Sequence, residues 1–351
     1  MGIAPSPSPL TYAKSGVDRT EVSIALRRLL DEVHFRPPPT HGRPLGLSGH
    51  YAGIVQIGRE RIAITTDTLG TKTLLTAAVG AWEWAGEDLV AVNANDLAAV
   101  GARASAFVDC LSVPRPEPET FAALGRGIDV GLRSSGMSLL GGETAVVPEL
   151  VGGLDLGGTA IGFFPRGREP VTGQRIRPGD LLIGIPSRGV HANGFTLIRR
   201  LLREGSVDLA QPRPGAREPV GRELLRPTRF YASVSEALAG LSTTHGFAHI
   251  SGGGVRNLVR LNPRVGFVLD RWPPPNGVFR WIQELGAIDL REMFQTFNMG
   301  IGFVAVTARE RLSETLRRLA RAGAPDAVVV GHVERGRGVR LPHLPLEYEG
   351  Y

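Results

Sequence analysis

An acidic residue and a lysine lie on either side of a glycine turn early in the chain. Asp67 follows Arg61–Thr66, an alternating Ile- and Thr-rich segment that predicts a β-strand, and Gly70-Thr71-Lys72 come next. A carboxylate suits a magnesium ion, and a lysine with backbone amides suits phosphate oxygens. The spacing is not that of a Walker loop, which needs Gly-x4-Gly-Lys. The segment predicts a magnesium–phosphate site, and the alternative is a turn with a solvated ion pair.

A second acidic residue, Asp96, falls on the apolar face of a predicted helix, Asp88–Val100. Leu89 and Val92 share that face, and a carboxylate there costs free energy unless it is paired or binds a metal. Asn93 lies one turn away and could join the same site. We therefore expect Asp96 to be a metal ligand, and the alternative is a carboxylate that caps a neighbouring element.

Three glycine-containing segments could bring backbone amides and acid–base groups to a ligand. Paired glycines precede Glu143, so a ligand could approach the backbone there, or the pair could form a tight turn beside a solvated glutamate. His191 and Asn193 lie between a predicted strand and a helix N-terminus, where anions bind and a histidine could transfer protons. A lone loop histidine is weak evidence by itself. Gly252-Gly253-Gly254 could cradle a phosphate or form a flexible connector.

Lysine is scarce in this basic chain. Of the 40 lysines and arginines, only Lys14 and Lys72 are lysines. A compact ammonium and a planar guanidinium are not interchangeable. We therefore expect both lysines to stand where an ammonium is required. The alternative is that lysine at these two positions has no functional significance.

Composition limits the classes of protein to which the chain could belong. Its 351 residues suffice for two domains, and its 42% hydrophobic and 21% charged residues are ordinary for a globular protein. No apolar run reaches the roughly 18 to 20 residues that cross a bilayer, so no membrane span is expected. The formal charge of +6 is spread along the chain without zinc or helix-turn-helix spacing. We therefore expect small phosphorylated ligands rather than nucleic acid.

The single cysteine, Cys110, excludes an intrachain disulfide and favours a cytoplasmic location. It lies inside a predicted strand, where we expect it to be packed rather than reactive. The segment Met1–Pro9 is rich in Pro and Ser and lacks a signal-peptide pattern, which predicts a flexible tail over residues 1–10.

Predicted helices and strands alternate in both halves of the chain, so each half is expected to be a layered α/β or α+β domain. A polar stretch with Gly and Pro at 166–179 predicts a boundary between domains 11–170 and 171–351. Gly136 should end one helix and Asn193 should cap another. The expected helices are 18–33, 88–100, 119–135, from 193, from 228, 278–285 and 309–321, and the expected strands are 61–66, 104–113, 156–164, 181–185, 247–250 and 327–333.

Eight short motifs, in order along the chain, resemble the phosphoribosylformylglycinamidine cyclo-ligase (AIR synthetase) family from about Thr11 to Arg340. Any one of them is weak, but eight in register are specific, and both lysines fall inside them. The matching stretches are Tyr12-Ala13-Lys14-Ser15-Gly16-Val17-Asp18, Thr66-Asp67 with Gly70-Thr71-Lys72, Asn95-Asp96, Gly141-Gly142-Glu143-Thr144-Ala145, His191-Ala192-Asn193-Gly194-Phe195, Pro227-Thr228-Arg229 with Tyr231, Ala248-His249-Ile250-Ser251-Gly252-Gly253-Gly254 and Thr296-Phe297-Asn298-Met299-Gly300-Ile301-Gly302.

The resemblance implies a two-domain fold and a reaction. The N-terminal, ATP-binding α/β domain would form a joint barrel with its copy in a homodimer, and the C-terminal domain would be a curved sheet covered by helices. ATP would phosphorylate the amide oxygen of formylglycinamidine ribonucleotide. A nitrogen of the same substrate would then displace the phosphate, giving aminoimidazole ribonucleotide, ADP and phosphate.

The resemblance also implies roles for the matching residues. Asp67 and Asp96 would hold Mg2+, and Lys72 and Lys14 would neutralise phosphates, with Lys14 counted among the catalytic residues. Glu143 and His191 are the candidates for acid–base chemistry or substrate orientation. The remaining candidates would bind the nucleotide or phosphate groups, and they are Gly49, Gly70, Thr71, Asn193, Gly252, Gly253 and Gly254.

The chain departs from the common family pattern at two places. Thr68-Leu69 stand where Gly-Val is common, and Val146 stands where glutamate is common, although Glu149 could compensate. These departures concern nucleotide and metal binding rather than the family. The rival interpretations are another ATP-dependent enzyme of the same superfamily, such as a formylglycinamidine ribonucleotide synthase or a selenophosphate synthetase, and a non-catalytic nucleotide-binding scaffold.

Overall fold

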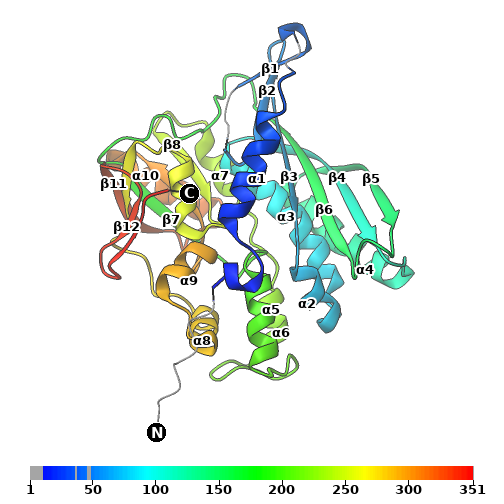
Figure 1. Cartoon of the computed structure of the whole chain (residues 1–351). Helices are drawn as coiled ribbons and strands as arrows, with labels where there is room; N and C mark the ends of the chain where they lie inside the picture. Colours follow the sequence, from blue (N-terminus) through cyan, green and yellow to red (C-terminus); the bar gives the residue numbers. More distant parts are fainter. Residues whose placement is uncertain (1–10, 36–37, 46–48, 351) are drawn as a thin grey trace.

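A computed structural model describes residues 11–35, 38–45 and 49–350 of the chain. Two mixed β-sheets, each with helices packed against it, form a two-domain α/β fold (Figure 1). The first sheet comes from residues 43–163 and the second from residues 181–348. The predicted tail, residues 1–10, lies outside the described residues. In the ranges that are described, no helix has the length and apolar character needed to span a bilayer.

The first sheet has six strands in the order β1-β2-β3-β6-β4-β5. All neighbours are antiparallel except β4 and β5, which are parallel and are connected through helix α4 (Pro118–Ser135). A parallel pair needs a crossover of this kind because the chain must return to the same end of the sheet. The strands are β1 (Arg43–Pro44), β2 (Gly53–Ile57), β3 (Glu60–Thr68), β4 (Arg103–Val113), β5 (Ser138–Val146) and β6 (Asp155–Phe163).

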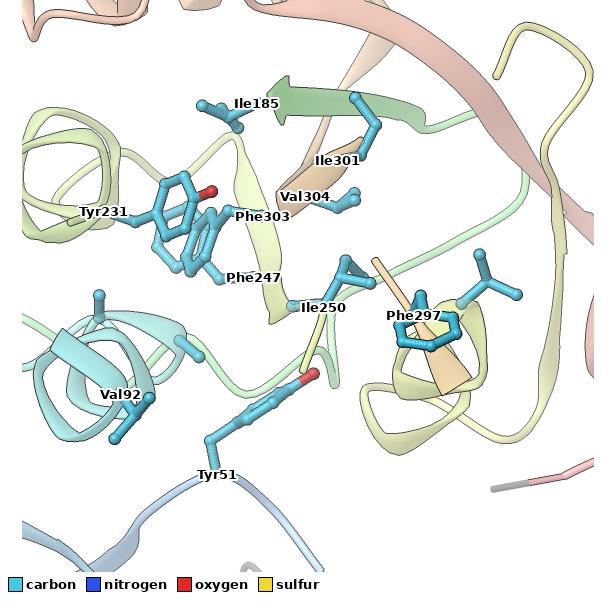
Figure 2. Close-up of a cluster of buried hydrophobic side chains, with 14 of the residues drawn as sticks. Tyr51, Val92, Ile185, Tyr231, Phe247, Ile250, Phe297, Ile301, Phe303 and Val304 are labelled. Carbon is cyan, nitrogen blue, oxygen red and sulfur yellow. The ribbon is translucent and has the colours of Figure 1, made fainter. Parts of the chain in front are cut away.

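Helix α3 (Trp82–Ala99) is buried on all sides because it packs against both halves of the molecule. It covers one face of the first sheet and also contacts β8 and α7 of the second half. Figure 2 shows α3, with Val92, beside the aromatic side chains of Tyr231, Phe247 and Phe303. The rings of Tyr231 and Phe303 stack with their centroids 5.1 Å apart. The helix is therefore part of the core of both domains.

Helices α3 and α4 cross at close range because glycines occupy the crossing. A Cβ on Gly127 would lie 1.8 Å from the backbone oxygen of Glu83, and a Cβ on Gly86 would lie 2.2 Å from that of Leu124. No real side chain tolerates such distances, so only glycine allows the two backbones to approach in this way.

We expect Gly127→Ala to lower the free energy of unfolding by about 2 kcal/mol, because overpacking costs roughly 1–3 kcal/mol and the better helix propensity of alanine offsets only part of it. Urea unfolding measures the change. Gly125→Ala on the same helix is the matched control, because a Cβ at Gly125 meets no heavy atom within 4 Å. That control should be neutral or stabilising, and equal changes in the two variants would contradict the close crossing.

The second sheet has seven strands in the order β13-β12-β9-β11-β7-β10-β8, antiparallel except between β12 and β9. Its strands β7, β10 and β8 are buried along almost their whole length, as expected when both faces are covered. The strands are β7 (Leu181–Pro186), β8 (Thr244–His249), β9 (Val265–Val268), β10 (Ile301–Thr307), β11 (Val328–Arg335), β12 (Val339–Leu341) and β13 (Leu346–Tyr348).

The remaining helices lie in the N-terminal region and around the second sheet (Figure 1). The α-helices are α1 (Arg19–Asp31), α2 (Lys72–Val79), α5 (Phe195–Glu204), α6 (Val220–Leu225), α7 (Ala232–Ala239), α8 (Gly277–Gly286), α9 (Leu290–Thr296) and α10 (Leu312–Arg321). The 3-10 helices are η1 (Ala13–Ser15), η2 (Pro39–His41), η3 (Gly254–Arg260) and η4 (Arg309–Arg311).

Most of the predicted elements are confirmed within a few residues, although α3 begins at Trp82, six residues before the predicted start at Asp88. The six predicted strands correspond to β3, β4, β6, β7, β8 and β11, and the helices predicted at 88–100, 119–135, 278–285 and 309–321 correspond to α3, α4, α8 and α10. Gly136 ends α4 in the left-handed conformation, with φ 71. The short helices α2, α6 and α9 were not predicted.

Two helix starts were predicted wrongly, and both lie in loops that are held by tertiary contacts. Gly194, not Asn193, is the residue before α5. The helix expected from Thr228 begins at Ala232, because the backbone amides of Thr228 and Tyr231 are bound by side chains of α3 instead of starting a helix.

The N-terminal helix is confirmed as α1, and Asp18 caps it by accepting hydrogen bonds from the amides of Thr20 and Glu21. Its predicted apolar face is not covered in the single chain, since Val22 is 58% exposed and Leu29 is 60% exposed. Cys110 is likewise exposed rather than packed, which corrects the prediction. The reason is that helices cover one face of the first sheet and Cys110 belongs to the other face.

Candidate active site

Two carboxylates, Asp67 of β3 and Asp96 of α3, lie close enough for their charges to interact. The Asn93 side chain accepts a hydrogen bond from the Asp67 amide (3.0 Å), which fixes the strand to the helix. Burial and, after it, the Asp96 charge raise the pKa of Asp67 to about 6. β3 continues through Asp67 to Thr68 rather than ending before it. The sequence correctly predicts that these two acids come together.

The acidic pair suits a divalent cation, because two neighbouring carboxylates with restricted access to water are unfavourable unless a cation joins them. Among the residues that the structure describes, no group of three or more His, Cys, Asp or Glu side chains is placed to hold a metal ion. Magnesium is commonly held by one or two carboxylates together with substrate phosphates. The donor set of Asp67 and Asp96 therefore fits Mg2+ that is shared with a phosphorylated ligand.

His249 connects the acidic pair to the second domain. Its Nδ1 lies 3.0 Å from Asp96 Oδ1, and its Nε2 is buried without a hydrogen-bond partner in the described part of the chain. The Tyr51 hydroxyl donates to the His249 carbonyl oxygen (3.0 Å), and the guanidinium of Arg260 stacks over the Tyr51 ring at 4.2 Å. Residues from both halves of the chain thus surround Asp96.

His191 lies in a buried slot next to His249. Its backbone has φ 65, an uncommon conformation for a residue other than glycine, and its side chain is 2% exposed. Its ring centroid is 6.3 Å from that of His249 and 6.1 Å from that of Tyr231. The slot exists because β10 carries Gly302, where a Cβ would lie 2.4 Å from His191 Cε1. Neither ring nitrogen of His191 has a hydrogen-bond partner among the described residues.

We expect the protein to lose stability as the pH falls below about 6.5, because burial, followed by the His249 and Lys72 charges, lowers the pKa of His191 well below its ordinary value of 6.5. The unfolded chain binds this proton near pH 6.5, whereas the folded chain does so only at lower pH. The contribution of His191 is therefore fully present above pH 6.5 and is lost as the pH falls.

A histidine that is protonated in the unfolded chain but not in the folded chain lowers the free energy of unfolding by up to ~1.4 kcal/mol for each pH unit of acidification. Burial also lowers the pKa of His50 to about 4, which adds to the same trend. Thermal melting between about pH 8 and pH 5 measures the slope. His191→Gln should flatten it, and an unchanged slope in that variant would rule out this assignment.

Lys72 is enclosed rather than open to a ligand. Its side chain is 1% exposed, and its Nζ lies 2.5 Å from Asp88 Oδ2 and donates to the His191 carbonyl oxygen at 2.7 Å. The ammonium also lies 5.1 Å from the centre of the Phe195 ring. The Lys72 ammonium is therefore already bound by groups of the protein, which argues against the predicted direct contact with phosphate. The expectation that Lys72 stands where a compact ammonium is needed fits the structure better than the phosphate role does.

The glycine-containing loops at Gly70, Asn193 and Gly252 lie next to one another. Gly70 has φ 50, and Thr71 next to it shares a hydrogen bond with Thr196 of α5 (2.9 Å). A Cβ on Gly252 would lie 2.7 Å from the Asn193 side-chain oxygen, so the loop at Gly252–Gly254 passes directly over Asn193. These residues come from three separate motifs, and the structure brings them together as predicted.

Gly49 lies beside the same loops. Arg260, at the end of η3, donates to the backbone oxygens of Gly49 (2.8 Å) and His50 (2.9 Å). The rest of the predicted nucleotide loop, residues 46–48, is outside the described residues.

Glu143 does not face the acidic pair. Asp67 pairs with Gly158, Gly158 with Asp109, and Asp109 with Gly142 across four strands. Paired residues share a face, and the next residue along a strand points to the other face. Glu143 therefore points to the open face of the first sheet, and in a single chain the structure keeps it apart from Asp67 and Asp96. The paired glycines lie within β5 rather than in a turn.

Lys14 lies in η1, exposed at the surface next to α5. Arg200 of α5 donates to the Lys14 carbonyl oxygen (2.5 Å), and the Tyr12 amide donates to Glu292 of α9 (2.9 Å). These contacts place the N-terminal motif on the second domain. The structure does not bring Lys14 into contact with the acidic pair.

Three groups that matter to this region were not predicted: Asp88, Asn95 and His249. The sequence carried a signal for the first two, since they lie seven residues apart on a helix and so share a face that is otherwise apolar. For His249, the only indication in the sequence was its position three residues before the Gly252–Gly254 loop, a predicted phosphate-binding segment. Its contact with Asp96 depends on how the two domains pack, which no local pattern reports.

The two sheets, the helix between them and the acidic pair at their junction define a class of two-domain α/β proteins, and the comparisons agree. The chain matches the model of the AIR synthase related protein N-terminal domain over residues 49–164 and the model of the C-terminal domain over residues 177–343. Solved structures with the same fold include the thiamine-monophosphate kinase from Stenotrophomonas maltophilia, with a TM-score of 0.63, 22% identity and coverage of 94% of this chain and 98% of that one. The hydrogenase maturation protein HypE from E. coli has a TM-score of 0.61, 19% identity and coverage of 82% and 84%.

Curated relatives are closer in sequence. A phosphoribosylformylglycinamidine cyclo-ligase of Thermococcus kodakarensis is 44% identical over 342 residues, covering 96% of this chain and 99% of that protein. One of Methanothermobacter thermautotrophicus is 40% identical over 338 residues, covering 95% and 97%. The chain belongs to the AIR synthetase, or phosphoribosylformylglycinamidine cyclo-ligase, family.

Proposed function

We propose that this protein uses ATP to close the imidazole ring of aminoimidazole ribonucleotide from formylglycinamidine ribonucleotide, a step of purine biosynthesis, with release of ADP and phosphate. One observation carries the proposal: relatives named as cyclo-ligases share about 40% of their residues with this chain along nearly its whole length. The acidic pair and the glycine loops that surround it agree with a reaction on phosphorylated substrates.

Asp67 and Asp96 would hold Mg2+ between them and the phosphates of ATP. When it is bound, the ion neutralises phosphate charge that two carboxylates alone would repel. Asn93 keeps Asp67 in place through its amide, and His249 fixes one oxygen of Asp96 so that the other is oriented.

The residues of this chain would otherwise work by positioning. An amide oxygen is a poor leaving group, and phosphorylation makes it a good one, so the site must align the donor phosphate, the amide oxygen and the attacking nitrogen. The backbone amides of Gly252–Gly254, next to Asn193, would hold a phosphate group, for example the ribose 5′-phosphate. His191 is neutral near pH 7 because burial lowers its pKa, so it would orient the substrate rather than supply a positive charge.

The homodimer and joint barrel also belong to this proposal. The open face of the first sheet exposes Ile64 (43%), Ile161 (37%) and Phe163 (39%). A contiguous apolar face of this kind suits an interface between copies of the chain. Glu143 lies on the same face, so any catalytic role for it would depend on the dimer. The domain limits 11–170 and 171–351, and a location in the cytoplasm, are part of the same proposal.

A turnover assay tests the proposal. Purified protein is mixed with ATP, magnesium and formylglycinamidine ribonucleotide, and the three products are quantified. We expect aminoimidazole ribonucleotide, ADP and phosphate in equal amounts. Release of ADP and phosphate without aminoimidazole ribonucleotide would favour a different enzyme of the superfamily, and no nucleotide turnover at all would favour the non-catalytic scaffold.

A further inference from the structure

An ion pair between Lys72 and Asp88 lies at the junction of the two domains. Lys72 begins α2 and Asp88 lies on α3, both in the N-terminal half, and their side chains are 1% and 0% exposed. Each partner has a second contact across the domain junction. Lys72 Nζ donates to the His191 carbonyl oxygen (2.7 Å), and Asp88 accepts from the Thr228 amide (2.8 Å).

The same stripe of α3 holds further backbone of the second domain. Asn95, seven residues after Asp88, donates to the Arg229 carbonyl oxygen and accepts from the Tyr231 amide, both at 2.9 Å. Asp88 and Asn95 thus fix the segment 228–231, which carries the Tyr231 ring that packs against His191. Two segments that meet at the His191 ring are therefore held by polar side chains of the N-terminal domain.

A buried ion pair is weak evidence for stability, since well-packed apolar residues of similar volume often serve as well or better. Apolar side chains could fill the space that Lys72 and Asp88 occupy. They could not bind a carbonyl oxygen or an amide, and so could not fix the backbone of His191 in its left-handed conformation. The directional contacts are what an apolar replacement would lose.

We propose that the Lys72–Asp88 pair is a positioning device that sets the His191 loop and the Thr228–Tyr231 segment in the arrangement needed for turnover. With side chains 1% and 0% exposed, the pair would act without direct contact to ATP or the nucleotide substrate. This inference rests on the proposed function for its kinetic readout. The pair acts through His191, whose ring depends on the slot left by Gly302, so a small backbone shift moves the ring out of place. A displacement of about 1 Å at a reacting group can lower a rate roughly a hundredfold.

The test is the double variant Lys72→Met/Asp88→Asn, which removes both charges while keeping volume and an acceptor for the Thr228 amide. We expect a melting temperature close to that of the wild type, a kcat about a hundredfold lower and a KM for either substrate changed less than about threefold. Hydrogen–deuterium exchange should be faster in the segment 189–194. If this double variant does not fold, Lys72→Leu/Asp88→Asn, which likewise leaves no unpaired charge, carries the same comparison.

Ser235→Ala is the matched control. The Ser235 hydroxyl donates to the Ala98 carbonyl oxygen (2.7 Å), which is a buried contact across the same junction that involves neither Lys72 nor Asp88. It should lower the melting temperature and leave kcat within about threefold. A double variant with wild-type kcat, or with unchanged exchange at 189–194, would overturn the positioning role. If the wild type shows no turnover, the proposed function fails, and the exchange measurement still decides whether the pair holds the loop.

Discussion

Replacing Asp96 with asparagine should lower kcat by roughly 10²- to 10³-fold and should weaken the dependence of the rate on magnesium. The physical reason is that Asp96 lies beside the buried Asp67, whose pKa is raised by burial and then by the Asp96 charge, and asparagine cannot supply the missing negative charge to a cation. Asparagine keeps the shape and an oxygen near His249 Nδ1, so the fold should persist. Steady-state kinetics over a magnesium titration measures the change.

Asp129→Asn is the control for Asp96→Asn. Asp129 lies on α4 with its side chain 58% exposed and pairs with Arg133 one turn away, so its loss should change neither activity nor stability appreciably. A folded Asp96→Asn protein with full turnover and the wild-type response to magnesium would refute the assignment of Asp96 to the metal.

Replacing Lys72 with methionine should lower the free energy of unfolding by about 3–5 kcal/mol, because Asp88 is then left charged and unpaired in the interior. A loss of this size lowers the melting temperature by roughly 10 °C in a protein of this length. Methionine keeps the volume of the lysine stem, so the change reports the charge rather than a cavity. Differential scanning calorimetry measures it.

The other lysine of the chain provides the comparison. Lys14 is exposed on η1, so Lys14→Met should change the free energy of unfolding by no more than about 0.5 kcal/mol. The double variant Lys72→Met/Asp88→Asn should recover most of the loss seen in Lys72→Met. Equal effects of the two single lysine substitutions would contradict the buried pair.

Much of the fold could be predicted from local pattern. Strands with Ile, Val and Thr in alternation, such as 61–66 and 104–113, and helices ended by glycine, such as the one before Gly136, carry their signal in a few neighbouring residues. The helix expected from Thr228 failed because α3 binds the amides of Thr228 and Tyr231 and so delays the helix to Ala232. A contact between residues about 140 positions apart leaves no local trace.

The site could be predicted only in part, for a similar reason. Asp67 and Asp96 were correctly predicted to lie close together. Asp67 stands near the end of a strand, Asp96 stands on the apolar face of a helix, and both features can be seen in the local sequence. The environment of Lys72 could not be predicted, because whether an ammonium faces a ligand or a buried Asp88 depends on how α2 packs on α3. The side of the sheet to which Glu143 points depends on the register of β5 against β4, and a shift of one residue would reverse it.

The fate of one oxygen atom distinguishes the proposed reaction from its alternatives. Formylglycinamidine ribonucleotide labelled with 18O at its amide oxygen is converted by the enzyme with unlabelled ATP in unlabelled water, and the released phosphate is analysed by mass spectrometry. If ATP activates the amide oxygen in this site, each phosphate formed together with aminoimidazole ribonucleotide carries one 18O atom. Phosphate without the label, formed while the ring closes, would show that the oxygen leaves by another route and that ATP does not phosphorylate the amide oxygen.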